Sequence, residues 1–415
     1  MTHLKRRLIP THAGLILLAL LSDVNRTEAQ QDVFSPPPPP PVQAVQPLGV
    51  RVFPDPPLSG IPPPESPFEW GALVLKPHFL YRFLYGDGIP ATPGHSSTTA
   101  INSFSPGVLA DIGSHWSIDY SPMWELYSNR IFHDTLDEYA SVLGAYNFGT
   151  WSFQLNQSYA YSSEPLIETG RQTTQETYST GLDVTDRLTR QILSETVLHQ
   201  DFRDGIGLPN TKEWSALEWL HYQFSSQLDA AVGGDFGFVD VLGGTETSYI
   251  QPQVQLIANP TDKISISASG GVDHREFLVQ PRTSLDTPMF SGSVQYAPFE
   301  STTLSLSTSR VVAQSFFVNQ STKNTQWRAV LKQRFLGHYL LTATASQFDS
   351  DYISNETGKS SGRSDRDLSY NVKVSWRFFR RGTMSVLYQW GRNTSNIQAF
   401  GFETHQVGFE IGYKY

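Results

Sequence analysis

The last eleven residues of the chain, HQVGFEIGYKY (residues 405–415), show the pattern that decides the fold. Apolar or aromatic side chains occupy every second position from Val407 to Tyr415, and glycine or polar residues fill the positions between them. Successive side chains of a β-strand point to opposite faces, so a period of two predicts a strand with one apolar and one polar face. We therefore expect these residues to form a strand that ends on an aromatic ring.

The same alternation recurs along the chain beyond residue 71. It is found in WSFQLNQSYAY (151–161), KISISASGGV (263–272), TLSLSTS (303–309) and YNVKVSWRF (370–378). Beyond residue 71 we find no long stretch with the 3.6-residue period of an amphipathic helix, and no segment apolar enough to span a membrane as a helix. The pattern predicts an all-β chain.

The connections between the predicted strands alternate in length. Eight are short and built from turn residues, such as those at Gly113 and Gly149, and nine are long and polar, such as residues 164–173 (EPLIETGRQT) and 350–365. Seventeen connections join eighteen strands, each of roughly 10–14 residues, against the 9–11 that a tilted strand needs to cross the hydrocarbon. Sixteen strands is the alternative count.

Short turns at one end and long loops at the other are typical of a transmembrane β-barrel. We predict an antiparallel up-and-down barrel over residues 71–415, in which the last strand pairs with the first near Leu73–Leu84. Closure pairs every backbone group, which is required in a medium without water. The alternative, a soluble propeller or solenoid, predicts a fixed sequence repeat that the chain lacks.

The first 70 residues differ from the rest. Lys5, Arg6 and Arg7 precede an apolar run, residues 13–21, and small residues follow up to Ala29, which is the pattern of a secretory signal peptide over residues 1–29. The apolar run is too short to be a membrane anchor, which needs about 20 residues. Residues 30–70 are rich in proline, which favours extended backbone, and we expect a disordered periplasmic linker there.

Composition and charge restrict the function. The chain has no cysteine, which excludes disulfides and thiolate metal sites and fits an exported protein. Its net charge of -9 does not indicate a nucleic-acid-binding protein. We expect a protein of the bacterial outer membrane, in contact with outer-membrane lipid.

Two segments resemble a known family. FSPGVLADIGSHWSIDYSPMWELYSN (104–129) and ETGRQTTQETYSTGLDVTDRLTR (168–190) are similar to the β-barrel porin 2 family of outer-membrane proteins, often encoded beside exopolysaccharide synthesis and export genes. The resemblance implies a porin-like barrel with a part in polysaccharide passage. It brings no catalytic residue and no cofactor.

If the apolar faces meet lipid, the alternate positions line a lumen wide enough for water. The predicted lumen-lining residues are Asp119, Glu125, Gln154, Asn156, Tyr249, Gln251, Gln253, Gln255, Arg328, Lys332, Arg334, Lys373, Arg377, Glu410 and Lys414. Amides and aromatic rings suit sugars, and the basic residues of the later strands would attract an anionic polymer or solute. The alternative is that these residues only solvate water.

The sequence therefore favours a porin-like channel for polysaccharide or oligosaccharide, with polysaccharide and a periplasmic export protein as expected partners. A structural or adhesive barrel is the first alternative. A barrel-embedded hydrolase is the second, although the chain has no GxSxG or HExxH motif. We expect no enzymatic activity, metal or cofactor.

The aromatic end of the chain has a further interpretation. Outer-membrane barrels commonly end in a strand whose terminal aromatic residue is read by the barrel insertion machinery, and this ending resembles that signal. Phe409, Ile411, Tyr413 and Tyr415 are the predicted signal residues, all on the lipid-facing side.

Overall fold

A computed structural model describes residues 68–92, 95–163, 165–278, 282–379 and 381–414. The predicted signal peptide and nearly all of the predicted linker lie outside the described residues, and so does Tyr415. The described part of the chain contains no helix that is long and apolar enough to cross a membrane.

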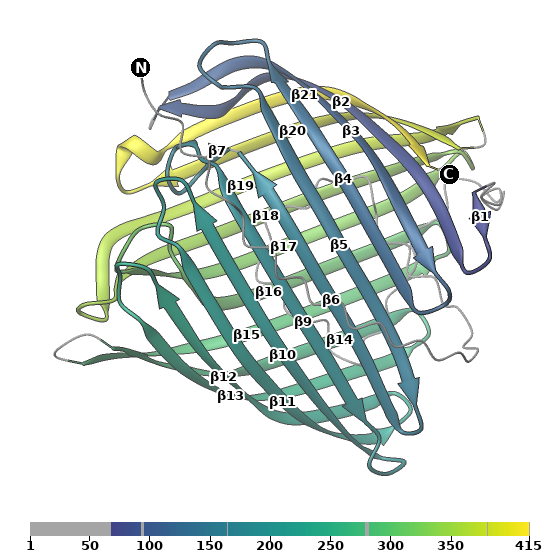
Figure 1. Cartoon of the computed structure of the whole chain (residues 1–415), viewed down its shortest axis with the longest axis vertical. Coiled ribbons are helices and arrows are strands. Elements are labelled where there is room, and N and C mark those ends of the chain that lie inside the picture. The colour runs from purple at the N-terminus through teal and green to yellow at the C-terminus, as the bar shows by residue number, and fades with distance from the viewer. Residues whose placement is uncertain (1–67, 93–94, 164, 279–281, 380, 415) are drawn as a thin grey trace.

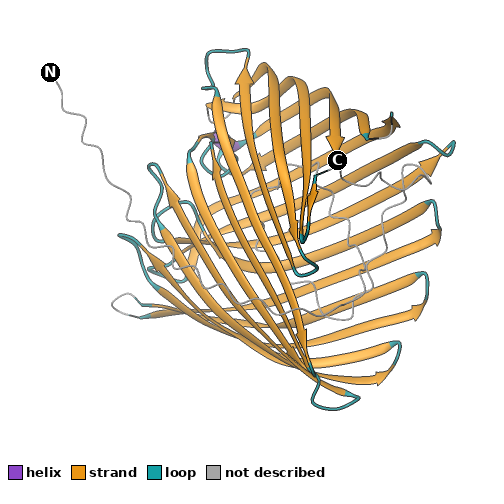
Figure 2. Ribbon diagram, turned by 45° about the vertical axis from the view of Figure 1, so that its right-hand side comes forward, coloured by secondary structure: helices purple, strands orange, loops and turns teal. Residues whose placement is uncertain are grey.

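The described residues are almost entirely β-strand (Figures 1 and 2). The strands of the first half are β1 (Glu69–Trp70), β2 (Leu73–Thr92), β3 (His95–Ile112), β4 (Trp116–Tyr127), β5 (Thr135–Phe148), β6 (Trp151–Ser162), β7 (Pro165–Leu166), β8 (Arg171–Gln172), β9 (Gln175–Asp186), β10 (Ile192–Gly205), β11 (Thr211–Ser225) and β12 (Leu228–Val241). The others are β13 (Thr247–Thr261), β14 (Ile264–Phe277), β15 (Thr283–Phe299), β16 (Thr302–Gln314), β17 (Gln320–Phe335), β18 (Tyr339–Ser354), β19 (Lys359–Phe378), β20 (Gly382–Ser395) and β21 (Phe402–Lys414), with a short 3₁₀ helix η1 at Gln398–Phe400.

Eighteen of these strands close into one antiparallel barrel, as predicted. Each long strand pairs with its neighbours along the chain, and β21 returns to β2 in a register that runs from His78↔Lys414 to Asp87↔His405. The predicted closing pair is therefore confirmed. β1, at the end of the predicted linker, adds a two-residue pairing to the start of β2.

The predicted alternation of short and long connections holds only in part, because residues 187–191 and 206–210, at opposite ends of the barrel, form connections of equal length. The short turns and the long loops lie at opposite ends, with the start of β2 and the end of β21 at the turn end (Figure 1). Gly113 and Gly149 have φ of 60° and 61°, a conformation that glycine adopts without strain in tight turns.

The predicted strand length of roughly 10–14 residues is confirmed for ten of the eighteen barrel strands and is too short for the other eight. The barrel strands have 12 to 20 residues, because segments expected to be loops continue the pairing beyond the apolar stretch. β18 and β19, for example, extend into residues 350–365 and remain paired at Ser354↔Lys359. Backbone pairing does not require apolar side chains, so the hydrophobic pattern underestimates strands that rise above the membrane.

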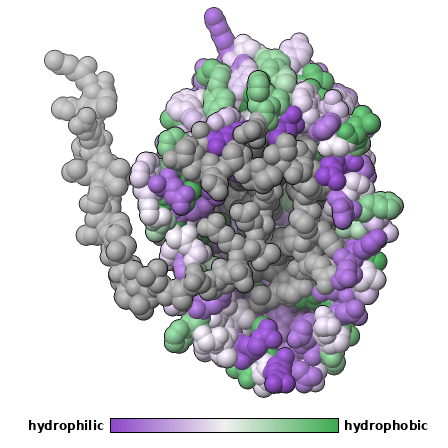
Figure 3. Space-filling view, turned by 90° about the vertical axis from the view of Figure 1, so that its right-hand side faces the viewer, coloured by the Kyte–Doolittle hydropathy of each residue, from purple (hydrophilic) through white to green (hydrophobic). Residues whose placement is uncertain are grey.

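The two faces of the barrel wall differ as the alternation predicts. Large apolar side chains stand exposed on one face, among them Val232 at 59%, Val254 at 60% and Phe236 at 54%. We call this the outer face and the opposite one the inner face. Figure 3 views the turn end of the barrel, where hydrophilic side chains are interspersed with hydrophobic ones around the rim. A soluble protein would bury such apolar stripes, whereas a barrel in lipid exposes them.

Candidate functional site: the inner face of the barrel

The inner face carries polar and charged side chains on nearly every strand. The fifteen residues predicted from the sequence to line the lumen all lie opposite the exposed apolar stripes: Asp119 and Glu125 on β4, Gln154 and Asn156 on β6, Tyr249, Gln251, Gln253 and Gln255 on β13, Arg328, Lys332 and Arg334 on β17, Lys373 and Arg377 on β19, and Glu410 and Lys414 on β21.

Charges of opposite sign lie on different parts of this face. Acidic side chains follow one another on β9 to β12: Asp183, Glu195, Asp201, Glu213, Asp229 and Asp235. Basic side chains predominate on β17 and β19, although β19 also carries Asp365 and Asp367, and β13 to β16 lie between the two groups. Figure 1 shows β9 and β10 on the near wall and β17 to β19 behind them. A field across the lumen follows from this separation.

The long connection between β6 and β9 contains a small hairpin formed by β7 and β8. The amide of Gly170 donates to the carbonyl of Leu166 at 2.7 Å, and Gly170 has φ of 66°. The hairpin leaves the wall between β6 and β9 and lies against β2. We call residues 165–174 the inner hairpin.

Glu168 at the tip of the inner hairpin contacts residues from distant strands. Its carboxylate accepts a hydrogen bond from the amide of Phe316 at 2.8 Å and another from the hydroxyl of Ser315, both in the loop between β16 and β17. The main-chain carbonyl of Glu168 accepts from Arg363 on β19 at 2.9 Å. The inner hairpin therefore crosses the loop end of the lumen.

Two arginines hold the aromatic residues around this contact. The Arg203 guanidinium lies 4.1 Å from the ring centre of Phe316. The Arg363 guanidinium lies 3.5 Å from that of Phe400 and is paired with Asp365 at 2.5 Å. Cation–π contacts of this kind gain strength when desolvated, so the crossing is fixed by charge and by packing.

Opposing electrostatic effects act on the pKa of Glu168 at the tip of the inner hairpin. Burial of the carboxyl group raises the pKa of Glu168 above its usual range. The hydrogen bonds that it accepts and the positive charges of Arg203 and Arg363 partly offset this effect. The carboxyl group consequently takes up a proton at higher pH than an exposed glutamate does.

On the inner face of β13, the flat aromatic ring of Tyr249 lies over the neighbouring strand. Its ring covers Gly237 on β12, where a Cβ atom would come within 2.0 Å of the ring. Its hydroxyl donates to Glu213 at 2.8 Å, and the Arg275 guanidinium lies 4.7 Å from the ring centre. Beside it, Gln251 donates to Asp273 at 2.9 Å.

Near β21, which closes the barrel by pairing with β2, two of the residues predicted to line the lumen pair with each other. Glu410 is held by Arg82 at 2.7 Å and by Lys373 at 3.6 Å. Lys373, counted from the sequence among the basic residues that would attract an anion, thus has a carboxylate partner in the wall.

The titratable groups that a hydrolase would need are divided between the two faces of the wall. In the segment DHRE (273–276), Asp273 and Arg275 pair on the inner face at 3.2 Å, whereas His274 on the outer face contacts Asp286 at 2.6 Å. On another part of the inner face, His221 lies between Glu195 at 3.1 Å and Asp229 at 2.8 Å. The described residues contain no group of three or more metal-ligating side chains placed to hold an ion.

Sequence reasoning missed the residues of the hairpin crossing. Glu168, Arg203 and Arg363 lie in or beside segments predicted to be polar loops, and nothing in their periodicity places them inside the barrel. A signal was present in Phe316 and Phe317, two adjacent rings in an otherwise polar loop.

A closed barrel of eighteen tilted strands, apolar outside and charged inside, satisfies its backbone hydrogen bonds internally and presents hydrocarbon to lipid. The chain therefore has the architecture of an outer-membrane β-barrel protein. Its place is the bacterial outer membrane.

Comparisons with known proteins extend this description. Neither a protein-family model nor a curated protein sequence matches the chain, so the resemblance to the β-barrel porin 2 family stays a prediction. Among solved structures, the chain is similar to the outer membrane protein OpdK from Pseudomonas aeruginosa, at 10% identity and a TM-score of 0.44 over 82% of this chain and 98% of that one. It is also similar to a BenF-like porin from Pseudomonas fluorescens Pf-5 (8% identity, TM-score 0.45, 82% and 99%) and to OccAB4 from Acinetobacter baumannii (11% identity, TM-score 0.44, 84% and 100%).

Proposed function

We propose that the chain is a porin-type channel that passes small polar and ionic solutes across the outer membrane. The observation that carries this proposal is the inner hairpin, which reaches from the β6–β9 side of the wall to Ser315, Phe316 and Arg363. A segment that crosses the lumen and is fixed there by hydrogen bonds narrows the passage. Selectivity in channels comes from such constrictions.

The charge distribution supports the same function. The acidic side chains on β9 to β12 and the basic side chains on β17 and β19 face one lumen. Their field would orient a solute with separated charges and attract an anion to the basic side. Because Lys373 is paired with Glu410, Arg328, which is exposed on β17, is the better probe of that side.

Planar-bilayer recording tests the channel. The purified, folded protein should give steady single-channel currents, and a salt gradient should give a reversal potential. Arg328→Gln on the inner face should shift the reversal potential toward cations. Arg366→Gln is the matched control, because Arg366 is an exposed outer-face arginine paired with Asp349. The absence of any steady current would contradict the proposal and favour a structural or adhesive barrel.

We propose oligosaccharide as one cargo, with polysaccharide and a periplasmic export protein as partners if the direction is outward. The amides of Gln154 and Asn156 on β6 and of Gln253 on β13 support sugar contacts, because amides pair with hydroxyl groups in both donor and acceptor senses. Liposome-swelling rates with oligosaccharides of increasing length test this cargo. Exclusion of every oligosaccharide with retained ion conductance would reject the cargo and keep the channel.

We also propose that the end of β21 is read by the barrel insertion machinery. Phe409, Ile411 and Tyr413 lie on the outer face of the closing strand. Removal of residues 413–415 should leave unfolded protein in the periplasm. Normal insertion of the shortened chain would reject this partner.

A further inference from the structure

The outer face of β11 carries a carboxylate between its aromatic residues. The outward positions from loop end to turn end are Lys212, Trp214, Ala216, Glu218, Leu220, Tyr222 and Phe224. Trp214 and Tyr222 are exposed at 39% and 41%, as expected of rings near the two membrane interfaces. Glu218 lies between them and is therefore at the depth of the hydrocarbon.

The wall supplies Glu218 with only part of the hydrogen bonding that a carboxylate accepts. Ser194 of β10 donates to it at 2.7 Å, and Thr196 of the same strand also donates. On its other side Glu218 is paired in register with Gly234 of β12, which has no side chain. Glu218 remains exposed. A carboxylate has about four acceptor positions, and a charge facing lipid is costly unless it is covered or paired.

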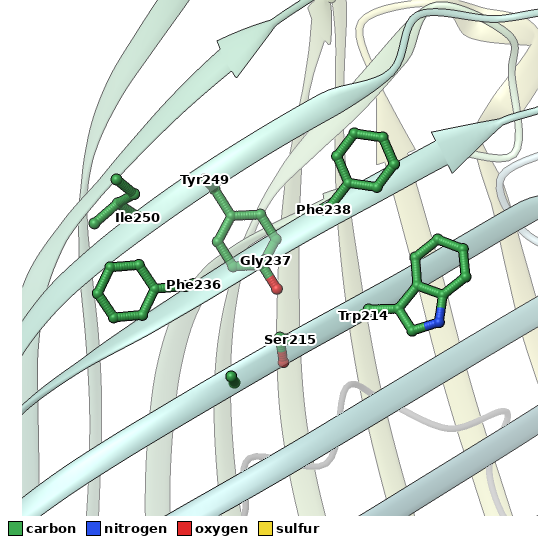
Figure 4. A pocket seen from close by; sticks show the side chains of 8 residues that line it. Trp214, Ser215, Phe236, Gly237, Phe238, Tyr249 and Ile250 are labelled. Atoms are coloured by element: carbon green, nitrogen blue, oxygen red, sulfur yellow. The ribbon is translucent and has the colours of Figure 1, made fainter.

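An aromatic hollow adjoins this carboxylate. Trp214, Phe236, Phe238 and Ile250 project around the strand that carries Gly237, and they border a shallow, open hollow of about 400 Å³ (Figure 4). The hollow is one side-chain row from Glu218, because Ala216 lies between Trp214 and Glu218 on β11. Tryptophan and other rings beside a desolvated polar group are the usual composition of an interface centre.

The same chain carries a complementary charge elsewhere on its outer face. Arg310 on β16 points to the same side as Leu304 and Leu306, which are exposed at 42% and 51%. Its side chain is half-buried, and the Nε atom is covered by the wall without a hydrogen-bond partner among the described residues, so the outer part of the guanidinium is what can reach another molecule. Arg310 is eight residues from Thr302 at the turn end of β16, and Glu218 is seven residues from Ser225 at the turn end of β11, so the two lie at similar depth.

We propose that the outer faces of β11–β12 and β15–β16 are the two halves of a head-to-tail contact between copies of this chain, with Glu218 of one copy against Arg310 of the next. β11 and β16 lie on different parts of the barrel wall, so one copy does not join them itself. A contact between two different patches repeats from copy to copy in the membrane plane, and it closes into a ring where the rotation between neighbours allows it. The aromatic hollow beside Glu218 receives the neighbour's outer-face side chains.

Cysteine cross-linking tests the contact cleanly, because the chain contains no cysteine of its own. Glu218→Cys combined with Arg310→Cys should give, on oxidation in intact outer membranes, covalent dimers and higher multiples of the chain. Each single variant should give none, since a head-to-tail contact does not bring like positions together. The control pair, Glu218→Cys with Tyr388→Cys on the outer face of β20, should also give none.

Further variants separate a missing contact from a defect in folding. Heat-modifiable migration identifies folded protein, and if the first pair does not fold, Leu220→Cys with Thr308→Cys tests the same two strands. In chains that carry Leu220→Cys and Thr308→Cys, the charge exchange Glu218→Arg with Arg310→Glu should restore the cross-linked multiples that either single reversal abolishes. Folded protein that stays monomeric, equal cross-linking of the control pair, or a cross-link only to a different protein would overturn the contact.

Discussion

Removal of the Glu168 carboxylate should release the inner hairpin from the opposite side of the lumen. Glu168→Ala deletes the two hydrogen bonds that the carboxylate accepts from Ser315 and from the amide of Phe316, but it leaves the main-chain contact to Arg363. Because burial disfavours the charged form of Glu168, each hydrogen bond is given the ordinary net contribution of about 1 kcal/mol, so the docked hairpin loses about 2 kcal/mol. That loss changes the ratio of docked to undocked hairpin about 30-fold.

Single-channel recording measures this ratio. The time spent at a higher conductance level, relative to the resting level, should rise about 30-fold in Glu168→Ala. Arg171→Ala is the matched control, because Arg171 lies on the same hairpin with its side chain exposed. Glu168→Gln keeps an acceptor for the Phe316 amide and should stay docked. Equal conductance levels and dwell times in Glu168→Ala and in the unchanged protein would refute the proposed constriction.

Three further predictions concern the wall and the hairpin tip. Gly237→Ala should lower the midpoint of urea unfolding by the equivalent of about 1–3 kcal/mol, because the added Cβ atom would lie 2.0 Å from the Tyr249 ring. Gly234→Ala is the control and should leave the midpoint unchanged, because its added Cβ atom has its nearest contact at 3.6 Å. Glu410→Gln should lower the midpoint of urea unfolding, because it leaves Arg82 and Lys373 without their carboxylate partner. The same change should increase selectivity for anions. Equal reversal potentials in Glu410→Gln and in the unchanged protein would contradict the expected change in selectivity. Because burial raises the pKa of docked Glu168, docking should strengthen as pH falls from that raised pKa toward the ordinary value of about 4.3 and weaken as pH rises. Openings should be rarer at acid pH than at neutral pH, and Glu168→Gln should abolish the difference.

The sequence predicts the barrel well because the fold depends on a local property. Alternation in residues 370–378 or 405–414 assigns each side chain to a face, and the alternation of short and long connections assigns each strand a direction. Together these determine strand number, pairing order and the closing pair of β2 and β21. They do not determine where a strand ends, since pairing continues into polar sequence.

The constriction depends on contacts that no local pattern encodes. Glu168 and Ser315 are far apart in the sequence, and their contact requires the hairpin to fold inward rather than outward. Both directions leave a polar loop with the same composition. What selects the inward one is the set of partners that only the closed barrel assembles, namely Arg203, Phe316 and Arg363.

The most informative residue of the outer face, Glu218, departs from the alternation of its strand. Alternation predicts an apolar residue at position 218, between Ala216 and Leu220, and the chain has glutamate there. From Trp214 to Phe224 the outer face of that strand otherwise follows the rule, so an exception with two hydroxyl donors marks a site whose requirement is not met by lipid. Substitution by the residue that the pattern predicts separates the two roles. Glu218→Leu should insert and fold at least as well as the unchanged chain, because it removes a charge from hydrocarbon. If the carboxylate serves an interface, the same variant should lose its association with other copies in the membrane, and intact association would show that Glu218 is not part of the contact.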